Sequence, residues 1–185
     1  MNNTTNRIQP ISPKLEEPLK SKMAQIFPPG LPAPSLYRTV ARNESLFIDM
    51  IDMNLIGPTG LLDRNTISPK LRELLILRTC VAARNEYEFH LHEQTISEQT
   101  GLSKAQITDL KHETVGEGLW SEKERALIDL IDGLVKNIEV AQPVFEEVRK
   151  YFEEAELIEL VQIIGLYTGV AMMVALAKPE LDHYR

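Results

Sequence analysis

Apolar residues recur at three- and four-residue intervals through most of the chain, which is the pattern of helices with a buried face. The first such stretch covers residues 34–56 and predicts a helix in one or two pieces. The second begins after Ser68, which suits the helix N-cap, with Pro69 at the first helical position. No segment has the alternation of a half-buried strand, so the sequence predicts an all-α protein.

Capping boxes and renewed apolar periodicity mark the helices that follow. Ser103 with Gln106, and Ser121 with Glu124, have the spacing at which each side chain bonds the other residue's backbone N–H. The helices predicted after residue 85 cover residues 86–99, a short stretch after Ser103, a longer one after Ser121, residues 142–152 and residues 153–177.

The first 35 residues differ from the rest because seven of them are proline. Proline fixes φ and removes a backbone donor, so this segment is predicted to be an extended N-terminal arm. Residues 36–185 are then predicted to form a single helical domain, which is long enough to bury its own core.

The last predicted helix is apolar on all sides, and residues 160–177 carry no formal charge. A membrane span is the rival interpretation, because this stretch approaches the required length of about 20 residues. Gln162 and Tyr167 interrupt the stretch, and acidic rather than basic residues precede it. Gly165 and Gly169 would let another helix approach closely, so we expect a buried helix in a homo-oligomer and no membrane span.

Composition and charge narrow the function classes. The chain is 43% hydrophobic and 25% charged, as in an ordinary globular protein, and its net charge of −7 without a basic cluster argues against nucleic-acid binding. No secretory signal is visible at the N-terminus, so we expect a cytoplasmic protein. Cys80 is the only cysteine, which excludes an intrachain disulfide.

Four polar residues stand out on two otherwise apolar helices. Glu73 lies near the start of the helix that follows Pro69, where a buried carboxylate would cost several kcal/mol unless paired or protonated. Asn85, Glu88 and His92 follow at spacings of three and four residues, which places them in one stripe of the next helix.

Three interpretations of this stripe remain open. The first is a metal site. His90 and His92 point to opposite sides of a helix and so cannot share a metal ion, and Glu73, Glu88 and His92 together form only a loose ligand set. A surface ion pair between Glu88 and His92 is the structural alternative. We favour a hydrogen-bonded relay without metal or other cofactor, in which a carboxylate orients the imidazole and the imidazole moves a proton.

The stretch LRELLILRTCVAARNEYEFHLHEQTISEQTGLSKAQI, residues 71–107, resembles the carboxymuconolactone decarboxylase family. Tyr87-Glu88-Phe89, His92 and Gly101-Leu102-Ser103 are similar to its Tyr-Glu-Trp, His and Gly-Leu-Ser elements, and the resemblance covers about residues 36–181. It implies a multi-helix bundle of the alkylhydroperoxidase D type, assembled as a trimer or hexamer.

Alkylhydroperoxidase D members of this family use a Glu, a CxxC pair and a His as a thiol and proton-relay site. Glu73 and His92 match that spacing, but Asn85 and Glu88 stand where the two cysteines would be. The family's disulfide-cycling peroxidase mechanism therefore cannot be carried over to this chain.

The decarboxylase members also lack the cysteine pair, so the resemblance implies acid–base chemistry on a small carboxylate or lactone. His92 is then the expected proton carrier, assisted by Glu88 and Glu73, with Asn85 and Tyr87 as substrate-binding residues. Two other functions remain open: a peroxidase-like redox protein that uses Cys80 alone or between subunits, and a non-catalytic oligomeric binding protein with a purely structural cluster.

Overall fold

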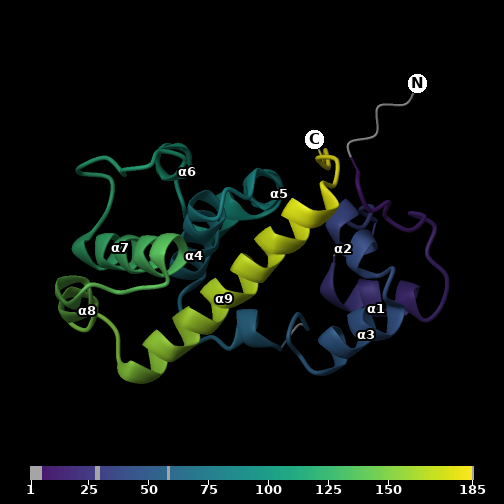
Figure 1. The fold of residues 1–185 in the computed structure, drawn as a ribbon, viewed down its shortest axis with the longest axis horizontal. Coiled ribbons are helices and arrows are strands. Elements are labelled where there is room, and N and C mark those ends of the chain that lie inside the picture. The colour runs from purple at the N-terminus through teal and green to yellow at the C-terminus, as the bar shows by residue number, and fades with distance from the viewer. Residues whose placement is uncertain (1–5, 28–29, 58, 185) are drawn as a thin grey trace. The chain divides into compact units, whose positions relative to one another are not determined.

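The computed structural model describes residues 6–27, 30–57 and 59–184, and the regular structure of these residues is helical throughout (Figure 1). This confirms the predicted all-α class. The chain divides into two compact units. The terminal unit joins the described residues up to 64 with those from 173 onward, and the central unit comprises residues 65–172.

The terminal unit contains α1 (Leu19–Ile26), α2 (Ser35–Val40), α3 (Glu44–Asp52) and the short 3₁₀ helix η1 (Leu61–Asp63). The helix predicted over residues 34–56 is thus formed in two pieces. Helix α1 lies within the segment predicted to be an arm, and the domain boundary near residue 35 stays a prediction. The core of this unit is formed by Leu19, Met23, Ala41, Phe47 and Ile51.

Both ends of the chain contribute to the terminal unit. The Asp182 carboxylate accepts hydrogen bonds from the backbone N–H of Ser35 at 2.8 Å and from its hydroxyl at 2.9 Å, and so caps α2 from the C-terminal tail. The backbone N–H of Arg7 donates to the carbonyl oxygen of Ala177 at 2.7 Å. The two terminal segments are therefore held together by hydrogen bonds.

The central unit is built around α4 (Pro69–Ala82), whose main packing partners are α7 (Glu122–Asn137) and α5 (Glu86–Thr95). It also contains η2 (Ser97–Thr100), α6 (Lys104–Leu110), α8 (Gln142–Val148) and most of α9 (Glu154–Ala177). The Ser68 side chain caps α4 as predicted, and both predicted capping boxes are present. Core positions of α4 are almost completely inaccessible to solvent.

Helix α5 ends earlier than predicted. The sequence predicted a helix to residue 99, but the α-helix stops at Thr95, and Ile96 has left the helical region with φ −133°. The Thr95 hydroxyl donates to the carbonyl oxygen of Leu91 at 2.6 Å, a bond that competes with regular helix geometry. The chain then turns into η2, which carries Ser97 toward α4.

Arg78 of α4 is a fully buried cation that the sequence pattern did not reveal. Its guanidinium donates to Asp132 of α7 through Nε at 2.6 Å and through Nη2. It also donates to the carbonyl oxygens of Leu110 at 3.2 Å, His112 at 2.8 Å and Glu113 at 2.6 Å. Arg78 therefore fixes α4 to α7 and to the segment that follows α6.

Helix α9 has two unlike faces. Leu160, Ile163 and Tyr167 are buried, whereas Ile158 is 65% and Met172 68% exposed. Among the described residues, α9 is the one helix long and apolar enough to cross a membrane, with a mean hydropathy of 2.0 over 18 residues, of which 28% are buried. That criterion uses length and composition alone, and core helices of soluble proteins also meet it.

We predict that Arg78→Met lowers the free energy of unfolding by about 3–5 kcal/mol, because it removes the buried cation that donates to Asp132 and to three backbone carbonyl oxygens. Urea denaturation followed by circular dichroism measures this loss. Lys136→Met is the matched control, since Lys136 pairs with the same Asp132 at 3.0 Å but is 34% exposed, and should cost less than about 1 kcal/mol. Equal losses in the two variants would contradict the role assigned to Arg78.

Candidate functional site

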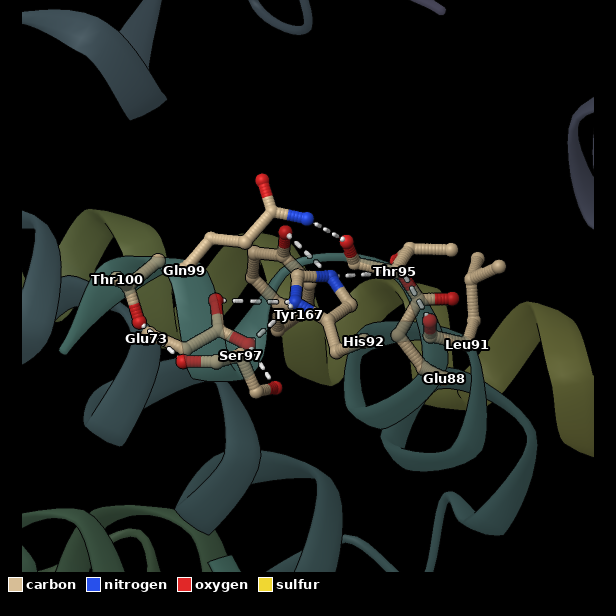
Figure 2. A network of polar contacts seen from close by, with 9 residues as sticks. All are labelled: Glu73, Glu88, Leu91, His92, Thr95, Ser97, Gln99, Thr100 and Tyr167. Atoms are coloured by element: carbon tan, nitrogen blue, oxygen red, sulfur yellow. Dashed lines mark hydrogen bonds and ion pairs between the residues drawn. The ribbon is translucent and has the colours of Figure 1, made fainter. Parts of the chain in front are cut away.

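Three helices of the central unit bring one polar cluster together (Figure 2). Glu73 comes from α4, Glu88 and His92 come from α5, and Tyr167 comes from α9. Ser97 of η2 completes the group. The segments are far apart in sequence, so the cluster exists only in the folded chain.

Glu73 is paired on one side of His92. Its two carboxylate oxygens lie 3.0 Å and 3.1 Å from Nδ1 of His92. The Ser97 hydroxyl donates to Oε1 of Glu73 at 2.6 Å. Because the Glu73 side chain is only 2% exposed, these two donors replace the water that a carboxylate normally requires. Glu73 therefore occupies the core as a paired charge.

The second nitrogen of His92 faces Glu88 and Tyr167. Nε2 lies 3.4 Å from Oε1 of Glu88 and 3.4 Å from the Tyr167 hydroxyl. The Tyr167 ring also meets the imidazole edge to face, with centroids 5.7 Å apart and planes at 79°. His92 thus stands between two carboxylates, as Figure 2 shows, with a shorter contact on the Nδ1 side.

These contacts change the protonation of His92. Burial alone would lower its pKa, but the charges and hydrogen bonds of Glu73 and Glu88 outweigh burial and raise the pKa of His92 to about 10. Burial pushes the pKa of Glu73 upward, yet the nearby His92 and the Ser97 hydroxyl bring it below its ordinary value. At neutral pH the pair is therefore an imidazolium and a carboxylate.

Asn85 lies just before α5 rather than within it. Its side-chain Oδ1 accepts a hydrogen bond from the backbone N–H of Glu88 at 3.3 Å, which makes Asn85 the N-cap of α5. Tyr87 is buried in the first turn of the same helix, with 4% of its surface exposed. The substrate-binding roles of Asn85 and Tyr87 stay predictions, as do the catalytic roles of Glu73, Glu88 and His92.

Cys80 lies in the core of α4, with 1% of its surface exposed. Burial, followed by the negative charges of Glu88 and Glu73, raises the pKa of its thiol well above the ordinary value. The thiolate is the reactive form of cysteine, so this environment disfavours thiol chemistry.

The described residues contain no group of three or more His, Cys, Asp or Glu side chains placed to hold a metal ion. His90 is half-buried, and its backbone carbonyl accepts a hydrogen bond from Gln94.

Sequence reasoning missed two members of the cluster. Ser97 gave no signal, because its contact with Glu73 depends on the early end of α5. Tyr167 did carry a signal, since it is a polar aromatic residue inside an apolar helix, but its position relative to His92 could not be derived from one helix.

Comparison with known proteins supports the fold. No protein-family model matches the chain, and no curated protein sequence matches it. Several solved structures do match the chain. One is a protein of unknown function from Agrobacterium tumefaciens, provisionally described as the antioxidant defence protein AhpD, with a TM-score of 0.65, 18% identity and coverage of 78% of this chain and 96% of that one.

Two further structures match over nearly the whole chain. An uncharacterized peroxidase-related protein from Silicibacter sp. TM1040 has a TM-score of 0.74 and 12% identity, covering 98% of this chain and 93% of that one. The debrominase Bmp8 has a TM-score of 0.66 and 16% identity, covering 95% and 92%. The chain therefore has the all-helical alkylhydroperoxidase D-like fold, which confirms the fold that the resemblance implied.

We predict that His92 stays protonated to well above pH 8, and that the chain loses stability as the pH rises from about 6.5 toward 10. The folded state then holds a proton that the unfolded state, with an ordinary His pKa of about 6.5, has released. NMR of ¹³C-labelled histidine measures the pKa, and thermal unfolding across this range measures the stability.

Glu73→Gln is the matched variant for this titration, because it keeps the side-chain shape and removes one of the two charges that hold the proton. It should lower the pKa of His92. A His92 signal that titrates near its ordinary value in the unmodified protein would contradict the ion pair.

Proposed function

We propose that this protein is an acid–base enzyme without a cofactor, acting on a small carboxylate or lactone by decarboxylation or a related lyase or hydrolase step. The observation that carries the proposal is His92, held as an imidazolium between two buried carboxylates, Glu73 and Glu88. A histidine that two buried carboxylates keep protonated at neutral pH can act as a proton donor.

Nε2 of His92 is the atom we assign to proton transfer. Nδ1 lies near both oxygens of Glu73, which fixes the ring, whereas the contacts of Nε2 are both 3.4 Å long and hold its proton less firmly. His92 has 13% of its side chain exposed, against 2% for Glu73, so it is the member of this pair nearer to solvent.

The decarboxylation would run as follows. The bond between the substrate carbon and its carboxylate breaks, carbon dioxide leaves, and the electron pair moves into the conjugated lactone carbonyl. The resulting dienolate accepts the proton from Nε2 of His92 at a ring carbon, and the imidazole regains a proton from solvent. A donor with a pKa of about 10 suits a carbanion of still higher basicity. Glu73 and Glu88 position the ring and stabilise its charge.

The names of the structural neighbours favour a redox function as the second candidate, because they include a peroxidase-related protein and a debrominase. In this chain such a role would fall to Cys80. Its burial and raised pKa oppose that role, since reactive cysteines are accessible and have a lowered pKa. The acid–base proposal is better supported by the described residues.

We further propose that the chain forms a homo-oligomer through the exposed face of α9. Residues at helical spacing on this face are exposed and apolar or small: Ile158, Val161, Gly165, Gly169 and Met172. A Cβ added to either glycine would meet nothing within 4 Å, so the same face of a second copy can approach closely.

For the catalytic proposal, we predict that His92→Gln reduces turnover of carboxymuconolactone by about 10²–10⁴-fold while the protein remains folded. Cys80→Ala should retain the activity of the unmodified protein. Product formation in D₂O, followed by mass spectrometry, should show one deuterium incorporated on a ring carbon for each carbon dioxide lost.

The opposite pattern, with activity lost in Cys80→Ala and kept in His92→Gln, would favour the redox candidate. A lack of turnover by the unmodified protein on carboxymuconolactone and simpler lactone acids would overturn the lyase proposal and favour a binding protein.

For the assembly, we predict that Met172→Glu lowers the mass measured by light scattering to that of a single chain. The control is Ile138→Asn, at a site 82% exposed outside α9, where φ is 55° and Asn is well tolerated. A monomeric unmodified protein, or one that requires detergent to stay in solution, would contradict the proposed interface.

A further inference from the structure

Two polar atoms at the start of α5 are buried without a hydrogen-bond partner among the described residues. They are Nδ2 of Asn85, a donor, and Oε2 of Glu88, an acceptor. Asn85 is 2% exposed and Glu88 is 4% exposed, so bulk water does not compensate for the missing bonds. Nearly all buried polar groups in proteins find a partner, so an unpartnered pair at a candidate site indicates a place for a ligand.

The local geometry explains why these two atoms remain available. Asn85 uses its oxygen to cap α5 on the backbone N–H of Glu88, which directs its amide nitrogen away from that bond. Glu88 uses Oε1 toward Nε2 of His92, which leaves Oε2. The residues are three positions apart at the first turn of α5, a spacing at which side chains are neighbours.

We propose that Asn85 Nδ2 and Glu88 Oε2 form a subsite for an uncharged group that carries an acceptor and a donor side by side, such as a lactam, a hydroxylactone or an enol. The acceptor of the ligand takes the hydrogen bond from Asn85, and its donor gives one to Glu88. This inference defines the substrate class of the proposed acid–base site, and so rests on that proposed function.

The charges of the cluster support an uncharged ligand group. Glu73 and Glu88 contribute two negative charges and His92 contributes one positive charge, so these three residues carry one net negative charge. A ligand carboxylate at Oε2 of Glu88 would meet a like charge and would offer no proton to it. We therefore place the carboxylate of a substrate outside this subsite and the uncharged end of the same substrate inside the subsite.

Three small molecules of similar size test the subsite on the full chain. δ-Valerolactam has an N–H donor beside a carbonyl acceptor, δ-valerolactone has acceptors only, and valerate carries a charge. We expect the lactam to bind at least about tenfold more tightly than the lactone, and valerate to bind most weakly, because a buried acceptor left unpaired disfavours the lactone. Chemical-shift titration by NMR measures the three dissociation constants.

Asn85→Ser removes the Nδ2 donor but keeps a hydroxyl that can cap α5, and Glu88→Gln keeps the shape while replacing the carboxylate. Each should weaken lactam binding about tenfold or more. Asn43→Ser is the matched control, because Asn43 caps α3 through the same bond, to the N–H of Leu46 at 3.3 Å, outside the central unit. It should leave lactam binding unchanged.

Equal affinity for lactam and lactone, no measurable lactam binding, or tightest binding of valerate would overturn the subsite. So would Asn85→Ser and Asn43→Ser having the same effect, which would indicate that water rather than a ligand pairs with these atoms. The turnover of carboxymuconolactone is measured in a separate activity assay. Active protein with the wrong order of binding would refute the subsite alone, and inactive protein with the expected order would refute the lyase step alone.

Discussion

The ion pair of Glu73 and His92 is the interaction on which the rest of the polar cluster depends. A carboxylate on a helix as apolar as α4 is tolerated in a core only if a cation and further donors lie within reach. His92 supplies the cation and Ser97 a second donor, so α4, α5 and η2 are fixed relative to one another. The same constraint holds the imidazole in its charged form.

The two ends of α5 allow this pair to form. At the start of α5, Asn85 caps the helix and places Glu88 in its first turn. At the end, the helix stops at Thr95, which brings Ser97 to Glu73. Helix α9 then covers Nε2 of His92 with Tyr167. The chemistry of the cluster therefore follows from where helices begin and end as much as from the residues within them.

The helix starts were predictable because their signals are local. Ser68 and the two capping boxes act within four residues, and each was found where the sequence placed it. The end of α5 and the bonds of Arg78 depend on partners far along the chain, which one sequence does not reveal. The grouping of Glu73 with His92 came from family resemblance rather than periodicity. Neither of these signals indicated that Ser97 joins the cluster.

The buried Cys80 can serve as a chemical reporter of opening in the central unit. It is the one thiol in the sequence, and in the folded chain its side chain projects from α4 into the core and is 1% exposed. A thiol reagent can therefore label it only in molecules whose central unit has opened. The rate of labelling then reports the population of the opened form, or the opening rate when labelling is faster than reclosing. A cysteine introduced on the surface would react alone in the folded protein, which gives selective attachment of a probe without first removing the native residue.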